Sequence, residues 1–313
     1  MDKINYEIIP YSKSYEAALL ELEQEASQGK FIQLEMIRDC FRTRALTFDK
    51  YQIYLTVDKN GKLLGVLGIA LVVFVMNGQK SNVAYYYDIR VKKEWQGLGI
   101  NNKMAEYSYH NFCKPNNIQY LFTTIKDSNK AAFNSAANVG FKLYKYPFLY
   151  LTIPTHIQFK KARIKPIQEV FSVTCSSKIA TINTYILPIK EDLKVWRTHL
   201  IYRLKLTRIH PLLVLLNKWS FMFNKTFSKT PEVGDYLNCS TLMYKRTPTI
   251  EQMNTTLSIL RNEKIDYLLV VCSKKSEIYK LLKRYSIHSY KYNLHSTFQI
   301  AKTDSIELDV RCL

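Results

Sequence analysis

The sequence lacks any arrangement of cysteines or histidines that would hold a metal ion or a disulfide framework. Its six cysteines are scattered and include no CxxC pair: Cys40, Cys113, Cys175, Cys239, Cys272 and Cys312. We therefore expect no metal cofactor and a reduced, cytoplasmic setting. The sequence also lacks a long apolar run. Its most apolar window, residues 209–223, is interrupted by Lys218 and is too short to cross a bilayer core of roughly 30 Å. Residues 1–10 contain no apolar core of signal-peptide length.

Acidic residues are scarce. The 313 residues include 45 Lys and Arg against 26 Asp and Glu, which gives a net charge of +19. Residues 1–153 carry 19 basic and 14 acidic side chains, whereas residues 154–313 carry 26 and 12. This charge predicts an anionic partner, and nucleic acid, an acidic membrane surface, an acidic protein and a phosphorylated cofactor all qualify. A hydrophobic content of 47% with 23% charged residues excludes a disordered, collagen-like or coiled-coil chain.

The hydrophobic pattern predicts an α+β fold in which helices cover a mixed sheet. Strands are expected at residues 4–10, 51–57, 63–76, 83–91, 118–125 and 140–153, and helices at 14–27, 31–41, 101–113 and 128–139. Asn60-Gly61 and Asn77-Gly78 mark two hairpin turns in this order. Pro154 and the basic segment 160–166 predict a linker, so we expect domains at residues 1–153 and 154–313.

A loop rich in small residues lies between the predicted strand at 83–91 and the helix that follows it. It contains Gln96, Gly97, Leu98, Gly99, Ile100 and Asn101. Glycines in such a loop let backbone N–H groups approach phosphate oxygens, and the helix N-terminus adds a partial positive charge. A second segment, from Asn129 to Phe141, forms a predicted helix that ends at Gly140.

Together these two segments resemble the GNAT superfamily of acyl-CoA-dependent N-acyltransferases. The family loop Q/R-x-x-G-x-G/A is met by Gln96 and Gly99, with Asn101 at the last position. The family helix N-x-x-A-x-x-x-Y-x-x-x-G-F is met at four positions, with Ala136 in place of tyrosine; the four are Asn129, Ala132, Gly140 and Phe141. The resemblance covers about residues 4–153.

The resemblance implies an acetyl-CoA donor. The amides of Gln96 to Asn101 would hold the pyrophosphate of coenzyme A, and the strand residues Ile89, Arg90 and Val91 would lie along its pantetheine arm. Asn129 and Phe133 would contact the cofactor from the next helix. Ala136 cannot protonate the departing thiolate as the family tyrosine does. Ser135, Asn134 or a tyrosine of the last strand could take its place, and a non-catalytic binding protein of the same fold is the alternative.

An amine acceptor arrives as an ammonium ion and needs a base. Asp88, the only acid between Asp58 and Glu94, is the first candidate for this base, and Tyr86 on the same strand is also expected to be catalytic. The alternative for Asp88 is a structural pair with Arg90. Glu35, on the helix expected at 31–41, is a weaker candidate. No histidine is spaced for a nucleophilic triad, so we expect direct transfer to the amine.

The second half repeats the end of the first. Ile250–Asn262 and Ser276–Tyr285 predict helices, and Ile265–Cys272 and Ile287–Ile300 predict strands. This repeat has no glycine loop, so we expect a smaller, degenerate GNAT-like lobe without a coenzyme. Residues 194–229 contain basic and aromatic side chains and no acid. They predict either a segment that packs on the core or a surface for an anionic membrane or an acyl carrier protein, with nucleic acid ranked last.

The sequence therefore predicts an N-acetyltransferase that moves an acetyl group from acetyl-CoA to a small-molecule or peptide amine. The charge of the second half favours acidic acceptors. The alternatives are a binding protein without activity and an acyltransferase that uses acyl carrier protein.

Overall fold

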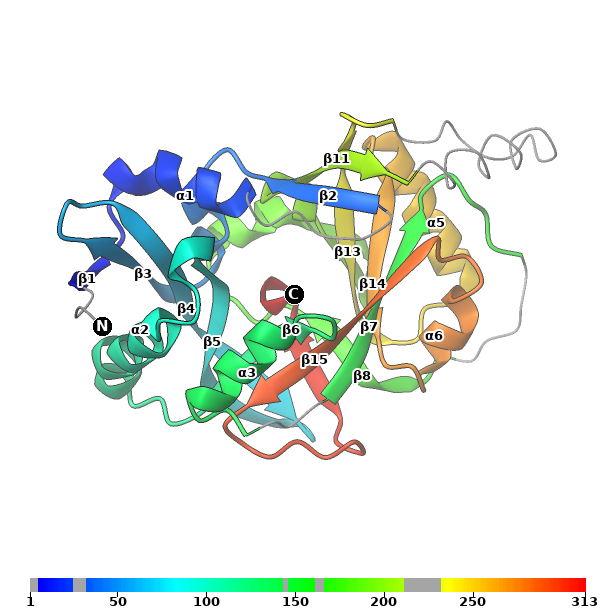
Figure 1. Cartoon of the computed structure of the whole chain (residues 1–313). Helices are drawn as coiled ribbons and strands as arrows, with labels where there is room; N and C mark the ends of the chain where they lie inside the picture. The colour runs from blue at the N-terminus through cyan, green and yellow to red at the C-terminus, as the bar shows by residue number, and fades with distance from the viewer. Residues whose placement is uncertain (1–4, 25–31, 143–145, 161–165, 211–231) are drawn as a thin grey trace.

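The computed structural model describes residues 5–24, 32–142, 146–160, 166–210 and 232–313. Its two lobes lie side by side in Figure 1. The elements of the first half are β1 (Tyr6–Pro10), α1 (Glu16–Gln24), β2 (Ile32–Ile37), β3 (Lys50–Asp58), β4 (Leu63–Met76), β5 (Gln79–Val91), α2 (Ile100–Ser108), β6 (Leu121–Lys126), α3 (Lys130–Asn138) and β7 (Tyr146–Pro154). Those of the second half are β8 (Gln168–Thr174), β9 (Ile186–Lys190), β10 (Leu193–Trp196), β11 (Arg203–Ile209), β12 (Tyr236–Leu237), β13 (Cys239–Arg246), α5 (Ile250–Asn262), β14 (Tyr267–Cys272), α6 (Glu277–Leu282), β15 (His288–Ser296) and β16 (Ile306–Asp309).

The antiparallel meander β3–β4–β5 was predicted correctly. Asn77 and Gly78 have φ of 51° and 78°, as a tight hairpin requires, and β4 spans the predicted residues. β4 is apolar throughout because both of its faces are buried. Val66 faces a core cluster that extends through both lobes. Leu67 faces a second cluster beneath α2 and α3.

The two lobes exchange their last strands. β7 of the first half lies between β14 and β15, and β15 of the second half lies between β7 and β6 in one 13-stranded sheet. The parallel pair β5–β6 in the first lobe has a counterpart in the parallel pair β13–β14. The predicted α+β fold, a mixed sheet with helices and a second lobe, is confirmed. The predicted boundary at residues 153 and 154 stays a prediction.

The expected helix at residues 31–41 is wrong. Ile32–Ile37 is a strand that pairs antiparallel with β11 and joins the two lobes in a small second sheet. Residues 32–36 alternate apolar and polar side chains, which is the period of a strand, and pairing with a distant segment decided the outcome. Glu35 therefore lies opposite Lys205 in this sheet rather than on a helix.

The basic segment 194–229 is only partly described, because residues 211–231 lie outside the described ranges. Two of its described arginines form ion pairs: Arg197 with Glu263 at 2.9 Å and Arg203 with Asp39 at 3.6 Å. In the part of the chain that the structure describes, no helix is long and apolar enough to cross a membrane.

Strand exchange makes the first half dependent on the second. A fragment that ends at residue 153 would leave β7 without β14 and β15 and leave β6 without β15. We expect this fragment to aggregate, because apolar faces and strand edges would be exposed. Size-exclusion chromatography of the expressed fragment tests this. A soluble, monomeric fragment with the turnover of the full chain would show that the second half is an independent module.

Candidate active site

The loop from Gln96 to Asn101 lies between β5 and α2, and its residues 96–99 are exposed. Gly97 and Gly99 have φ of 80° and 76°, and a Cβ built at either would meet no atom within 4 Å. Gly99 is the N-cap residue of α2 and offers no side chain to its amides. The Gln96 side chain closes the loop by donating from Nε2 to the Val91 carbonyl oxygen at 3.0 Å. The space in front of the loop is therefore open.

The amides of this loop are available to a ligand. Among the described residues, no acceptor is found for the backbone N–H groups of Gly97 through Asn102. The first N–H groups of a helix have no partner within it, and together with the helix dipole they attract an anion. The loop therefore has the properties of a phosphate site.

β5 presents an open edge beside this loop. β6 pairs with β5 only from Ala84 to Tyr86. Beyond that point β5 contains a bulge, because Asp88 and Ile89 lie opposite Leu67 alone on β4. Within the described ranges, no strand pairs with the edge of Ile89–Val91 that faces away from β4. An extended ligand can use this edge as a strand would.

The matching position in the second lobe is closed. The parallel pair β13–β14 can be aligned with the parallel pair β5–β6 by matching Cys239 to Ala84. In this alignment Tyr244 and Arg246 of β13 correspond to Ile89 and Val91 of β5. Both residues are paired with β8. The following helix, α5, begins with a capping box in which Thr249 Oγ1 accepts from the Gln252 N–H at 3.2 Å and Gln252 Oε1 accepts from the Thr249 N–H at 2.7 Å. Among the residues that the structure describes, the free amides and the open edge therefore occur together only in the first lobe.

The remaining predicted cofactor residues have structural partners. Asn129 caps α3, with Oδ1 accepting from the Ala132 N–H at 3.1 Å. Phe133 is buried and packs edge-on against His295, with ring centroids 4.6 Å apart. Asn101 donates from Nδ2 to Ser135 Oγ and so joins α2 to α3. Ile100 is also buried, whereas Leu98 is exposed.

Asp88 lies in the bulge with φ of 49°, and its partners differ from the expected one. Arg38 Nη1 donates to Oδ2 at 2.8 Å and Arg44 Nη1 to Oδ1 at 3.1 Å. Burial would raise the pKa of Asp88, but the two guanidiniums outweigh it and hold the pKa well below its usual range. A carboxylate held in this way is a poor proton acceptor, which disfavours the expected role of Asp88 as the base.

Arg90 pairs with Glu23 of α1 instead. Arg90 Nη2 donates to Glu23 Oε1 at 3.0 Å, and Arg38 Nη2 shares the same oxygen at 2.8 Å. Sequence reasoning did not single out Glu23, because it is one of several glutamates in an acidic helix. Its only signal is its position four residues after Leu19 on the buried face of α1.

The structure does not bring Tyr86 and Asp88 together. Tyr86 points beneath α2, where its hydroxyl lies 2.8 Å from Ser108 Oγ. Burial raises the pKa of Tyr86, so its hydroxyl stays protonated. Tyr85 and Tyr87 lie on the opposite face of β5 with stacked rings 5.7 Å apart, and Arg44 lies over both rings.

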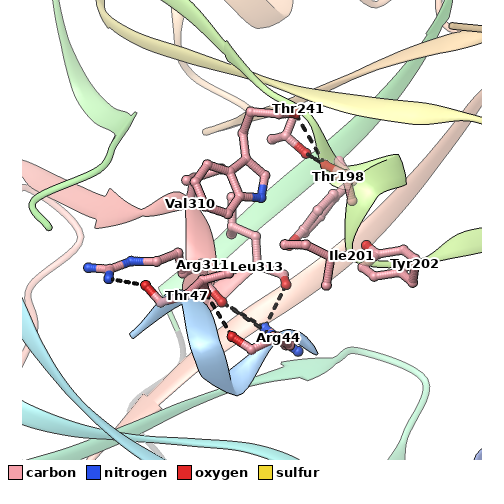
Figure 2. Close-up of a pocket in the computed structure, with 11 residues that line it drawn as sticks. Arg44, Thr47, Thr198, Ile201, Tyr202, Thr241, Val310, Arg311 and Leu313 are labelled. Atoms are coloured by element: carbon pink, nitrogen blue, oxygen red, sulfur yellow. Dashed lines mark hydrogen bonds between the residues drawn. The ribbon is translucent and has the colours of Figure 1, made fainter. Parts of the chain in front are cut away.

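A small cavity of about 20 Å³ lies between the lobes beside Arg44. Its lining is Arg44, Thr47, Tyr150, Trp196, Thr198, Ile201, Tyr202, Thr241, Val310, Arg311 and Leu313. Figure 2 shows Arg44 reaching across it to the backbone oxygens of Arg311 and Leu313, at 2.9 and 2.8 Å. Arg44 therefore connects Asp88 to the turn that follows β16.

Comparison with known proteins supports the resemblance of the first lobe to the GNAT family. The model of the acetyltransferase (GNAT) family matches residues 16–141. Saccharomyces cerevisiae N-myristoyltransferase with bound myristoyl-CoA has a TM-score of 0.56 and 10% identity, covering 96% of this chain and 86% of that chain. A second structure of that enzyme, with myristoyl-CoA and inhibitors, gives 0.55 and 10%, covering 95% and 82%.

A GNAT-family acetyltransferase of Staphylococcus aureus has a TM-score of 0.32 and 17% identity, covering 45% of this chain and 85% of that chain. No curated protein matches the sequence. At 10% identity the likeness to the yeast enzyme shows a shared two-lobed fold. Residues 16–141 are therefore a domain of the acetyltransferase (GNAT) family, and the protein is an enzyme of the acyl-CoA-dependent N-acyltransferase type.

Proposed function

We propose that this protein moves an acetyl group from acetyl-CoA directly to an amine. One observation carries the proposal: the backbone amides of Gly97–Asn102 have no acceptor among the described residues, and the open edge at Ile89–Val91 precedes them in the chain. The loop would hold the pyrophosphate through backbone N–H groups, and the open edge would align the pantetheine amides. Such alignment places the thioester for attack and lowers the entropic part of the barrier.

The side chains packed on β5 next to the open edge are the reason for proposing a short acyl group. Tyr85, Tyr86 and Tyr87 fill both faces of β5 there and are all buried. The yeast enzyme of the same fold was solved with myristoyl-CoA, so a long acyl chain is the alternative.

We expect kcat/KM for acetyl-CoA to exceed that for myristoyl-CoA at least tenfold. The physical reason is that burying a long chain would require the three packed tyrosines to move. Release of the coenzyme A thiol, measured with each donor and the same amine, checks this. A higher kcat/KM with myristoyl-CoA would contradict the acetyl assignment and leave the acyltransferase assignment intact.

The acceptor we propose is a small-molecule or peptide amine, with acidic molecules favoured. The support is charge: among the described residues, Arg38, Arg44 and Arg90 form ion pairs with two carboxylates, Glu23 and Asp88. The whole chain carries +19. A cytoplasmic location also belongs to this proposal. All six cysteines are free thiols, which suits a reducing compartment.

Thiol release from acetyl-CoA with a panel of amines tests the proposal. The panel should contain acidic peptides, neutral peptides and polyamines at matched concentrations. We expect turnover to require an amine and to be fastest with acidic acceptors at low salt. Coenzyme A binding without turnover of any amine would identify a non-catalytic binding protein. Turnover only with an acyl carrier protein donor would identify the other alternative.

A further inference from the structure

Glu23 is a buried residue in which one of the two carboxylate oxygens has no hydrogen-bond partner among the described residues. Its side chain is 1% exposed, and Oε1 forms ion pairs with both Arg38 and Arg90. Among the described residues, Oε2 has no hydrogen-bond partner and is buried. Leaving a buried acceptor unsatisfied is costly, so such a group calls for an explanation.

A purely structural ion pair in the same chain looks different. Asp309 and Arg311 are both buried, and Arg311 uses two nitrogens on two oxygens: Nε to Oδ1 at 2.8 Å and Nη2 to Oδ2 at 2.7 Å. Asp88 likewise has a guanidinium on each oxygen. Glu23 alone among these three carboxylates concentrates two guanidiniums on one oxygen and leaves the other for something else.

Burial holds the pKa of Glu23 above its usual value in spite of the arginines around it. The groups that face it are Arg38 from the turn after β2, Asp88 and Arg90 from β5, and Arg44. Burial is the largest effect and raises the pKa of Glu23, the negative charge of Asp88 adds to it, and the three arginines oppose it without cancelling it. Asp88 has its pKa lowered in the same network. Two carboxylates whose pKa values are pushed apart mark a division of roles.

Glu23 is also joined by an ion pair to the strand edge that the proposed function uses. Arg90, which holds its Oε1, belongs to the open edge of β5. We propose that Glu23 is the base that accepts the proton lost by the acceptor ammonium, directly or through one water, an inference that rests on the proposed function. Oε2 takes one proton from the ammonium, and the neutral amine attacks the thioester carbonyl. The amide bond forms as the C–S bond breaks, the second amine proton leaves with coenzyme A as its thiol, and Glu23 releases its proton to water.

The test is E23Q, which keeps an oxygen for the two arginines and removes the base. We expect kcat/KM for a protonated alkylamine of the panel to fall by about 10²–10⁴-fold. The KM for acetyl-CoA should change little. The loss should shrink as pH rises, because the amine then arrives already neutral, and it should be much smaller with hydroxylamine, which is neutral at pH 7.

Glu21→Gln is the matched control, because Glu21 lies exposed on the same helix and should behave as the unchanged protein. A difference infrared titration of the unchanged protein against E23Q should show a carboxyl group with a pKa above the usual glutamate value.

An E23Q protein that binds acetyl-CoA normally and keeps the full rate at every pH would overturn the inference and leave the proposed function intact. An equal loss with the alkylamine and hydroxylamine at all pH values would also overturn it, in favour of a structural role. An unchanged protein that acetylates no amine would overturn the proposed function, and this inference with it.

Discussion

Replacing Gly99 with valine should weaken coenzyme A binding at least tenfold, about 1.4 kcal/mol. Gly99 has φ of 76° at the N-cap of α2, a backbone angle that a β-branched residue resists. The side chain would point into space where no protein atom lies within 4 Å, which is the space the pyrophosphate would need. Isothermal titration with coenzyme A measures the change, and unchanged affinity in a folded G99V protein would contradict the assignment.

Gly78 supplies the control for this experiment. It has φ of 78° in the turn between β4 and β5, and a Cβ there would also meet no atom within 4 Å. Gly78→Val therefore imposes a similar backbone strain at a site away from the loop. We expect it to lower the free energy of unfolding while coenzyme A affinity stays the same. Equal loss of affinity in both variants would show that strain, rather than the loop, explains the result for Gly99.

Replacing Arg38 with methionine should lower the free energy of unfolding by about 3–5 kcal/mol near pH 8. The Arg38 side chain is completely buried and holds both Glu23 and Asp88, at 2.8 Å each. Its removal leaves two buried carboxylates with fewer opposing charges. Urea unfolding of R38M and the unchanged protein, followed by circular dichroism, measures this difference.

The effect of pH on R38M has a definite sign. In the unchanged protein the pKa of Asp88 is lowered, so its stabilising contribution is present above the unfolded pKa of about 3.9 and is lost as pH falls below it. In R38M both carboxylates would have higher pKa values and would take up protons on folding. The stability difference should therefore shrink as pH falls from 8 towards 5. A difference that stays constant or grows over that range would show that the carboxylates are not the cause.

Arg197→Met is the control for Arg38. Arg197 pairs with Glu263 at 2.9 Å, with both side chains about one-third exposed or less, at 27% and 32%. A partly exposed pair of this kind contributes about 0–1 kcal/mol. We expect R197M to unfold within that range of the unchanged protein and to show little dependence on pH.

The phosphate loop and its strand could be predicted because their signals are local. Gly97 and Gly99 supply the positive φ that the turn needs, and the long apolar run of β4 shows a strand buried on both faces. The sequence motif also carries the family resemblance. Each of these signals lies within a few consecutive residues, so no knowledge of distant contacts was required.

The features that could not be predicted depend on contacts between distant segments. Ile32–Ile37 became a strand because β11, about 170 residues later, pairs with it. The exchange of β7 and β15 between the lobes has no local signature. The partners of Asp88 come from positions 50 and 44 residues away, and a side chain two residues along the same strand was the expected partner instead. Glu23 was missed for the same reason.

Hydrogen–deuterium exchange of the full chain with and without coenzyme A tests the central claim most directly, because it reports on the backbone amides themselves. We predict that coenzyme A slows exchange at Gly97–Asn102, where the amides have no acceptor among the described residues, and at Ile89–Val91. Exchange at Tyr244–Gln252, the closed counterpart in the second lobe, should not change. Unchanged exchange at Gly97–Asn102 under saturating coenzyme A, or protection at Tyr244–Gln252 instead, would contradict a single donor site in the first lobe.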